Sequence, residues 1–94
     1  MNLKEIEAKI VWAKQKAFTR KFEGDKDRFE LMIGWLVGLG MAKGIHNMYE
    51  RYDEGGYFSE EIECVLKGLK QPKTPYEQGI KEALEWCLEG GKDD

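Results

Sequence analysis

The sequence predicts an all-α fold, in which a small four-helix bundle-like protomer assembles into a homo-oligomer. Two observations indicate the fold class. Apolar residues recur every three or four positions along the 94-residue chain, and no stretch alternates convincingly with a period of two. Both prolines, Pro72 and Pro75, come late, so the first 70 residues are free to form helix. This length fits one helical domain over residues 1–94.

The helices are expected at about residues 3–22, 26–53, 59–70 and 75–89. The clearest start signal is T-P-Y-E, in which Thr74 caps the last helix, Pro75 takes its first position and Glu77 completes a capping box. Ser59 is expected to cap the third helix, because serine accepts a hydrogen bond from a free amide there. Each of these signals supports a bundle of short, separately capped helices.

Composition limits the classes of partner. The net charge of −3 argues against a duplex nucleic-acid binder, which needs a basic surface to neutralise phosphates. The longest apolar run, about 12 residues from 31 to 42, falls short of the roughly 20 that cross a membrane. The chain begins with a charged helix rather than a signal peptide. We therefore expect a cytoplasmic protein that does not enter a membrane.

The cysteine and histidine content predicts neither a metal site nor another cofactor. Cys64 and Cys87 are 23 residues apart and form no CxxC motif, and His46 is the single histidine. We expect two free thiols. His46 lies among polar residues and is interpreted as a solvated surface side chain. Because no nucleophile motif, phosphate-binding loop or carboxylate pair stands out, the sequence predicts a protein that is not an enzyme.

Two helices carry more apolar surface than a small bundle can bury. The first half of the helix expected at 26–53 is apolar on every side, yet it contains glycines four residues apart, an arrangement that lets another backbone approach closely. Three apolar residues of the first helix lie about 120° from its main stripe. We expect an oligomer interface at Val11, Phe18, Phe22, Gly34, Gly38, Gly40 and Gly44. The alternative is a monomer whose glycines admit bulky side chains.

The segment 12–28 is the main candidate for a ligand site. Trp12 lies about 140° from the apolar stripe, Lys16 follows one turn later and Thr19 is close by. Lys26 and Arg28 flank the start of the second helix. An indole beside ammonium groups can stack a nucleobase while the cations contact phosphate. The alternative interpretation is a solvated basic face on which Trp12 anchors an interface.

This layout resembles the small phage sponge proteins that block CBASS immunity by sequestering cyclic nucleotides. Those proteins are of similar length, mainly helical and oligomeric, and hold the ligand between subunits. The resemblance implies that Trp12 is the stacking aromatic and Lys26 the cation, with Arg28 and Lys67 adding polar contacts. It further implies stoichiometric binding of a small anionic nucleotide without bond cleavage, in the cytoplasm of an infected host cell.

A second interpretation is a protein-interaction module. A small acidic helical protein can bind and inhibit a host protein through exposed aromatic residues, which are frequent in interface hot spots. Trp12, Phe18 and Trp86 are the candidates for that surface.

Overall fold

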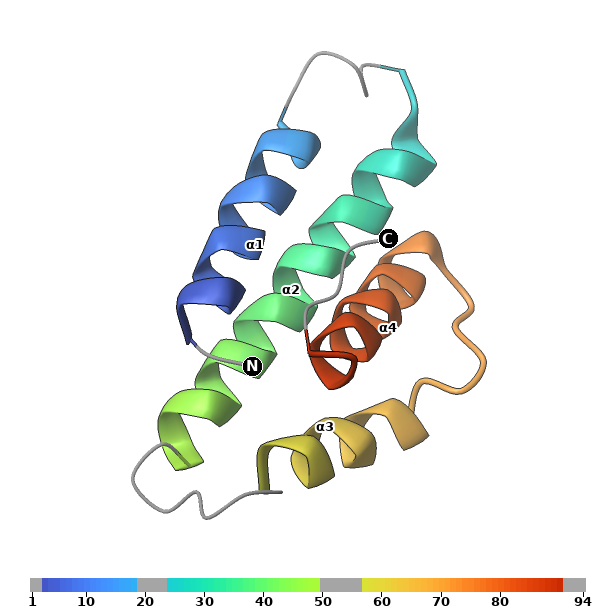
Figure 1. The fold of residues 1–94 in the computed structure, drawn as a ribbon. Helices are drawn as coiled ribbons and strands as arrows, with labels where there is room; N and C mark the ends of the chain where they lie inside the picture. The colour runs from blue at the N-terminus through green and yellow to red at the C-terminus, as the bar shows by residue number, and fades with distance from the viewer. Residues whose placement is uncertain (1–2, 19–23, 50–56, 91–94) are drawn as a thin grey trace.

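The computed structural model describes residues 3–18, 24–49 and 57–90, and these residues form helices without strands (Figure 1). The helices are α1 (Leu3–Ala17), α2 (Lys26–Tyr49), α3 (Tyr57–Lys67) and α4 (Pro75–Leu88). The prediction of an all-α chain with four helices is confirmed for the described residues. The expected extensions of the first two helices, at 19–22 and 50–53, lie outside them, as do Thr19 and Phe22.

The central element is α2, along which both α1 and α4 pack (Figure 1). The helix α1 runs antiparallel to α2, since Glu7 Oε1 lies 3.6 Å from Lys43 Nζ near one end of the pair. At the other end the rings of Phe18 and Phe29 meet with centroids 6.2 Å apart. The last turn of α1 therefore lies beside the first turns of α2. This arrangement brings the two halves of the basic segment together.

The core forms where the four helices meet. Among the described residues, the largest fully buried side chains come one from each helix, namely Ile6, Leu39, Ile62 and Leu84. α3 contacts both α2 and α4, beneath α4 in Figure 1. Burial of apolar surface contributes roughly 25 cal/mol per Å², so these contacts are the main stabilising contribution to the bundle.

The backbones of α2 and α4 touch at glycine residues. A Cβ atom on Gly34 would collide with the carbonyl oxygen of Tyr76, and one on Gly79 with the carbonyl oxygen of Leu31. A Cβ atom on Gly38 would lie 2.8 Å from that of Ala83. The expectation that Gly34 and Gly38 face a second copy is therefore corrected. α4 of the same chain covers this face, because the missing side chains let the two helices approach closely.

The second glycine pair lies elsewhere on α2. A Cβ atom on Gly40 or Gly44 would meet no heavy atom within 4 Å among the neighbours considered. Val11 on α1 is 55% exposed, and Phe18, which directly follows α1, is 69% exposed. Gly40 and Gly44 lie on the face of α2 that turns away from α4, as the 100° helical step from Gly34 and Gly38 requires. Phe29 shares this face of α2, and its ring meets that of Phe18. The described part of the chain thus leaves this apolar face uncovered.

The capping signals have mixed outcomes. Thr74 Oγ1 accepts a hydrogen bond from the amide of Glu77 at 3.1 Å, which confirms the expected start of α4. Glu77 Oε2 in turn accepts from the amide of Lys73 at 2.7 Å. The prediction for Ser59 is wrong, because α3 begins two residues earlier and Ser59 lies within its first turn. Gly90 follows α4 with φ 77°, a conformation that favours glycine.

Candidate functional site

A pocket of about 290 Å³ lies between the end of α1 and the start of α2. Its lining residues are Trp12 and Lys16 from α1 with Arg28, Leu31 and Met32 from α2. Three residues of the predicted ligand site, Trp12, Lys16 and Arg28, therefore come together although 16 positions of sequence separate the first from the last. The antiparallel packing of the two helices places them there, since the last turn of one faces the first turn of the other.

The lining combines an apolar wall with two cationic side chains. Trp12 and Leu31 are half-buried, and Met32 is buried in the core. Lys16 is half-buried as well, whereas the Arg28 side chain is 69% exposed. An indole surface next to an ammonium and a guanidinium suits a flat ring that carries an anionic group. The lining therefore offers a stacking surface and two cationic groups to a ligand.

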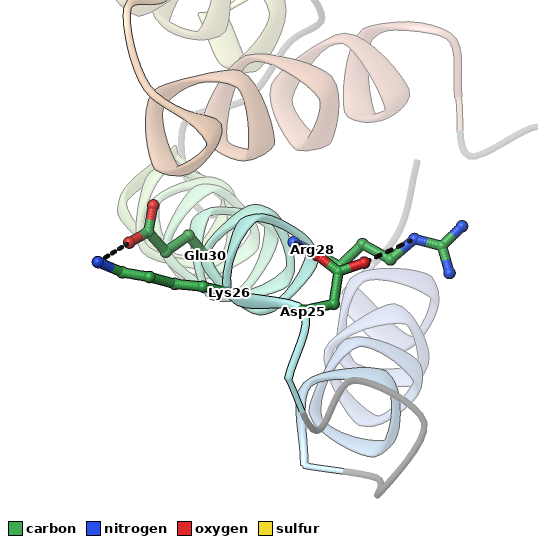
Figure 2. A network of polar contacts seen from close by, with 4 residues as sticks. All are labelled: Asp25, Lys26, Arg28 and Glu30. Carbon is green, nitrogen blue, oxygen red and sulfur yellow. Dashed lines mark hydrogen bonds and ion pairs between the residues drawn. The ribbon is translucent and has the colours of Figure 1, made fainter.

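The carboxylate of Asp25 contacts both the backbone and the side chain of Arg28 (Figure 2). Its Oδ1 accepts a hydrogen bond from the Arg28 amide at 3.1 Å, and its Oδ2 lies 3.8 Å from Arg28 Nε. The first contact occupies an amide that could otherwise receive an anion at the start of α2. The second contact is solvent-exposed and contributes only about 0–1 kcal/mol. A phosphate group can therefore compete with Asp25 for the guanidinium.

The other predicted cations lie away from this pocket. Lys26 projects from the opposite side of α2 to Arg28, with its Nζ 3.8 Å from Glu30 Oε1 (Figure 2). Lys67 lines a separate hollow of about 340 Å³ on α3, with Glu63, Leu66 and Lys70. Within the described part of one chain, neither lysine joins Trp12.

Trp12 is less exposed than the sequence predicts. Its ring is half-buried and meets the ring of Trp35 edge-on, with centroids 5.6 Å apart. Trp35 in turn contacts the ring of Trp86 at 6.5 Å. Trp86 is only 8% exposed, so of its two interpretations, cover for a neighbouring helix or part of an exposed interaction surface, the first is confirmed and the second is wrong. It covers α2, because α4 packs with that face turned inward.

Sequence reasoning missed Leu31 and Met32, the two residues that complete the apolar wall. Both belong to the all-round apolar half of α2, where periodicity does not distinguish a pocket wall from ordinary core. The length of the connection between the first two helices is the signal that could have found these two residues. A short connection between consecutive helices favours antiparallel neighbours, which places residues after 28 opposite those before 18.

The structure also describes His46 and the two thiols. His46 is half-buried beside Phe58, with ring centroids 5.9 Å apart, and its Nδ1 has no hydrogen-bond partner among the described residues. The prediction of a solvated surface residue is therefore wrong. Cys64 and Cys87 are both free, as expected, and burial raises the pKa of the Cys87 thiol to about 12.

Within residues 3–18, 24–49 and 57–90, no three His, Cys, Asp or Glu side chains gather in a way that could hold a metal ion. None of the described helices has the length and apolar character required to span a membrane. Comparison of the chain with known protein families, with curated proteins and with solved structures found no match.

Proposed function

We propose that this chain is a non-catalytic binding protein that sequesters a cyclic nucleotide signalling molecule and so counters a host antiviral defence. The observation that supports the proposal is the meeting of Trp12, Lys16 and Arg28 in one pocket. The aromatic ring offers a stacking surface of the kind that contributes about 1–3 kcal/mol per base in single-strand binders. The two cations offer charge-assisted hydrogen bonds to phosphate.

The size of the pocket favours a ligand shared between copies of the chain. Ligand pockets usually enclose about 300–1,000 Å³, so the 290 Å³ of this pocket is just below that range. The pocket of one chain suits a single base with its phosphate, and the rest of a larger cyclic nucleotide lies beyond it. A neighbouring copy supplies that remaining contact in our proposal. Lys26, which projects from the opposite side of α2 to Arg28, is then available to a ligand held by the neighbour.

The test is a binding series with mono-, di- and cyclic nucleotides. Ligand binding to the native state raises the melting temperature, so we expect a shift with at least one cyclic nucleotide. Trp12→Leu keeps an apolar contact with Trp35 but removes the stacking ring, and it should weaken binding about 10-fold to 100-fold. Arg28→Ala should weaken binding in the same direction. Lys14→Ala is the control, because Lys14 is exposed and lies outside the pocket lining.

Two outcomes would count against this function. No melting shift with any nucleotide removes the binding proposal, and equal loss in Trp12→Leu and Lys14→Ala removes the assigned pocket. Recovery of the intact nucleotide from the denatured complex separates sequestration from hydrolysis. A cleaved product would contradict the non-catalytic part of the proposal.

The interaction module is the second candidate, and exposed aromatic surface favours it. Phe18 and Phe29 are 69% and 39% exposed, and their rings pack against each other near the end of α1. Aromatic residues of this kind are enriched at interfaces. The nucleotide series decides between the two functions, because a protein inhibitor shows no melting shift with nucleotides.

A further inference from the structure

Three tryptophans from three different helices converge on one place in the bundle. Trp12 of α1, Trp35 of α2 and Trp86 of α4 form a chain of edge-on contacts, with centroid separations of 5.6 and 6.5 Å. Trp35 Nε1 donates a hydrogen bond to Glu82 Oε1 at 3.3 Å, which restricts rotation of the central indole. Gln78 Nε2 donates to the other oxygen of Glu82 at 2.9 Å and holds that carboxylate in turn.

The ammonium group of Lys9 lies among these rings. Its Nζ is 3.8 Å from the ring centroid of Trp12, 5.1 Å from that of Trp86 and 5.5 Å from that of Trp35. All three distances fall within the roughly 6 Å over which a cation is attracted by the negative face of an aromatic ring. A single lysine contact with one tryptophan is ordinary, whereas three indoles around one ammonium form an aromatic cage.

A primary ammonium is not the cation that such a cage holds best. Its three N–H groups are strongly hydrated, and that hydration opposes its transfer onto apolar rings. A quaternary ammonium has no N–H groups and presents methyl groups, and aromatic cages commonly recognise such cations. Lys9 and Trp12 are both only half-buried, so the cage is accessible from solvent on the side of α1.

We propose that Trp12, Trp35 and Trp86 form a binding site for a trimethylammonium group, which the Lys9 side chain occupies until such a ligand displaces it. The side chain of Lys9 has four flexible carbons and can turn outward from its helix without moving the backbone. The site shares Trp12 with the nucleotide pocket but uses neither Lys16 nor Arg28. Its ligand carries the opposite charge to a nucleotide, and the inference stands apart from the proposed function.

The experiment uses choline as the probe and tryptophan fluorescence as the readout. If Lys9 fills the cage in at least nine molecules of ten, its removal raises the apparent affinity about 10-fold or more. We therefore expect Lys9→Ala to bind choline at least about 10-fold more tightly than the wild type. Lys14→Ala, which removes an exposed lysine of the same helix, should bind choline as the wild type does.

A neutral molecule tests whether the charge matters. The alcohol 3,3-dimethylbutan-1-ol has the shape of choline with carbon in place of the charged nitrogen, and it should not bind Lys9→Ala measurably. Absence of choline binding to Lys9→Ala would overturn the proposal if circular dichroism shows that the variant is folded. Equal binding of choline and the alcohol would overturn it as well, because the site would then be only an apolar pocket.

Discussion

At the scale of single residues, Lys26 and Arg28 show that two cations close together in the sequence need not belong to the same site. They are two positions apart, which corresponds to about 200° around a helix, so they leave α2 on opposite sides (Figure 2). Arg28 reaches the pocket with Trp12, whereas Lys26 pairs with Glu30. A candidate site that uses both cations therefore needs a second chain.

The two thiols have contrasting surroundings. Cys64 is exposed on α3, whereas Cys87 of α4 is buried in the core of the bundle. Burial disfavours the thiolate and raises the pKa of Cys87 from 9.0 to about 12. Because the thiolate is the reactive form, the two residues should differ strongly in reactivity.

We expect one thiol per folded chain to react quickly with a disulfide reagent at pH 8, and the second to react only as the protein unfolds. At that pH a thiol with a pKa of about 12 is ionised in about one molecule in 10,000. Absorbance of the released reagent measures both phases, and in denaturant both thiols should react together. Cys64→Ser should abolish the fast phase alone. Two equally fast thiols in the folded protein would contradict the buried position of Cys87.

At the scale of elements, α2 organises the molecule through two glycine pairs with different surroundings. Gly34 and Gly38 face α4, where backbone meets backbone with Gly34 Cα about 3.0 Å from a Cβ placed on Gly79. Gly40 and Gly44 face open space within the described part of the chain. The first pair therefore allows α4 to pack closely on α2, whereas the second leaves room for contact with another molecule.

Alanine substitutions should separate these two roles. Gly34→Ala forces α4 away from α2 and should lower the free energy of unfolding by about 3 kcal/mol, the upper part of the usual range for overpacking. Gly40→Ala is the matched control on the same helix. In dilute solution it should raise stability by about 0.5–1 kcal/mol, because alanine favours helix. Chemical denaturation measures both, and similar effects in the two variants would contradict the described packing of α2 against α4.

At the scale of the whole molecule, one apolar face remains uncovered by the described helices. Four apolar side chains are each exposed by 39% or more, namely Val11 on α1, Phe18 directly after α1, and Phe29 and Met48 on α2. The open glycines of α2 lie near this face. A chain of 94 residues buries only about 60–65% of its unfolded surface, so association would add stability to a marginal monomer.

We expect the chain to sediment as a multiple of its 10.9 kDa mass at micromolar concentration. Phe18→Lys should shift the distribution towards 10.9 kDa, because it places a charge on the proposed contact. Tyr76→Lys is the control, since Tyr76 is 39% exposed but belongs to α4. A single 10.9 kDa species for the wild type at all concentrations would exclude the shared ligand site.

Much of the fold follows from local signals in the sequence. Helical periodicity predicts the four helices, and Thr74 with Glu77 predicts where the last one begins. The third helix begins at Tyr57 rather than after Ser59, because a serine in a first turn resembles a cap in sequence. Part of the pocket lining was also predictable, since Trp12 and Lys16 are one turn apart on a single helix.

The tertiary structure alone decided which helix faces meet. The sequence indicated that α2 must be surrounded and that its glycines allow close approach, but these properties are the same whether the neighbour belongs to the same chain or to another. Packing of α4 onto Gly34 and Gly38 assigned that face, and antiparallel packing of α1 added Arg28, Leu31 and Met32 to the pocket. Local periodicity depends on residues a few positions apart, whereas these contacts join residues far apart in the chain, so only the folded arrangement specifies them.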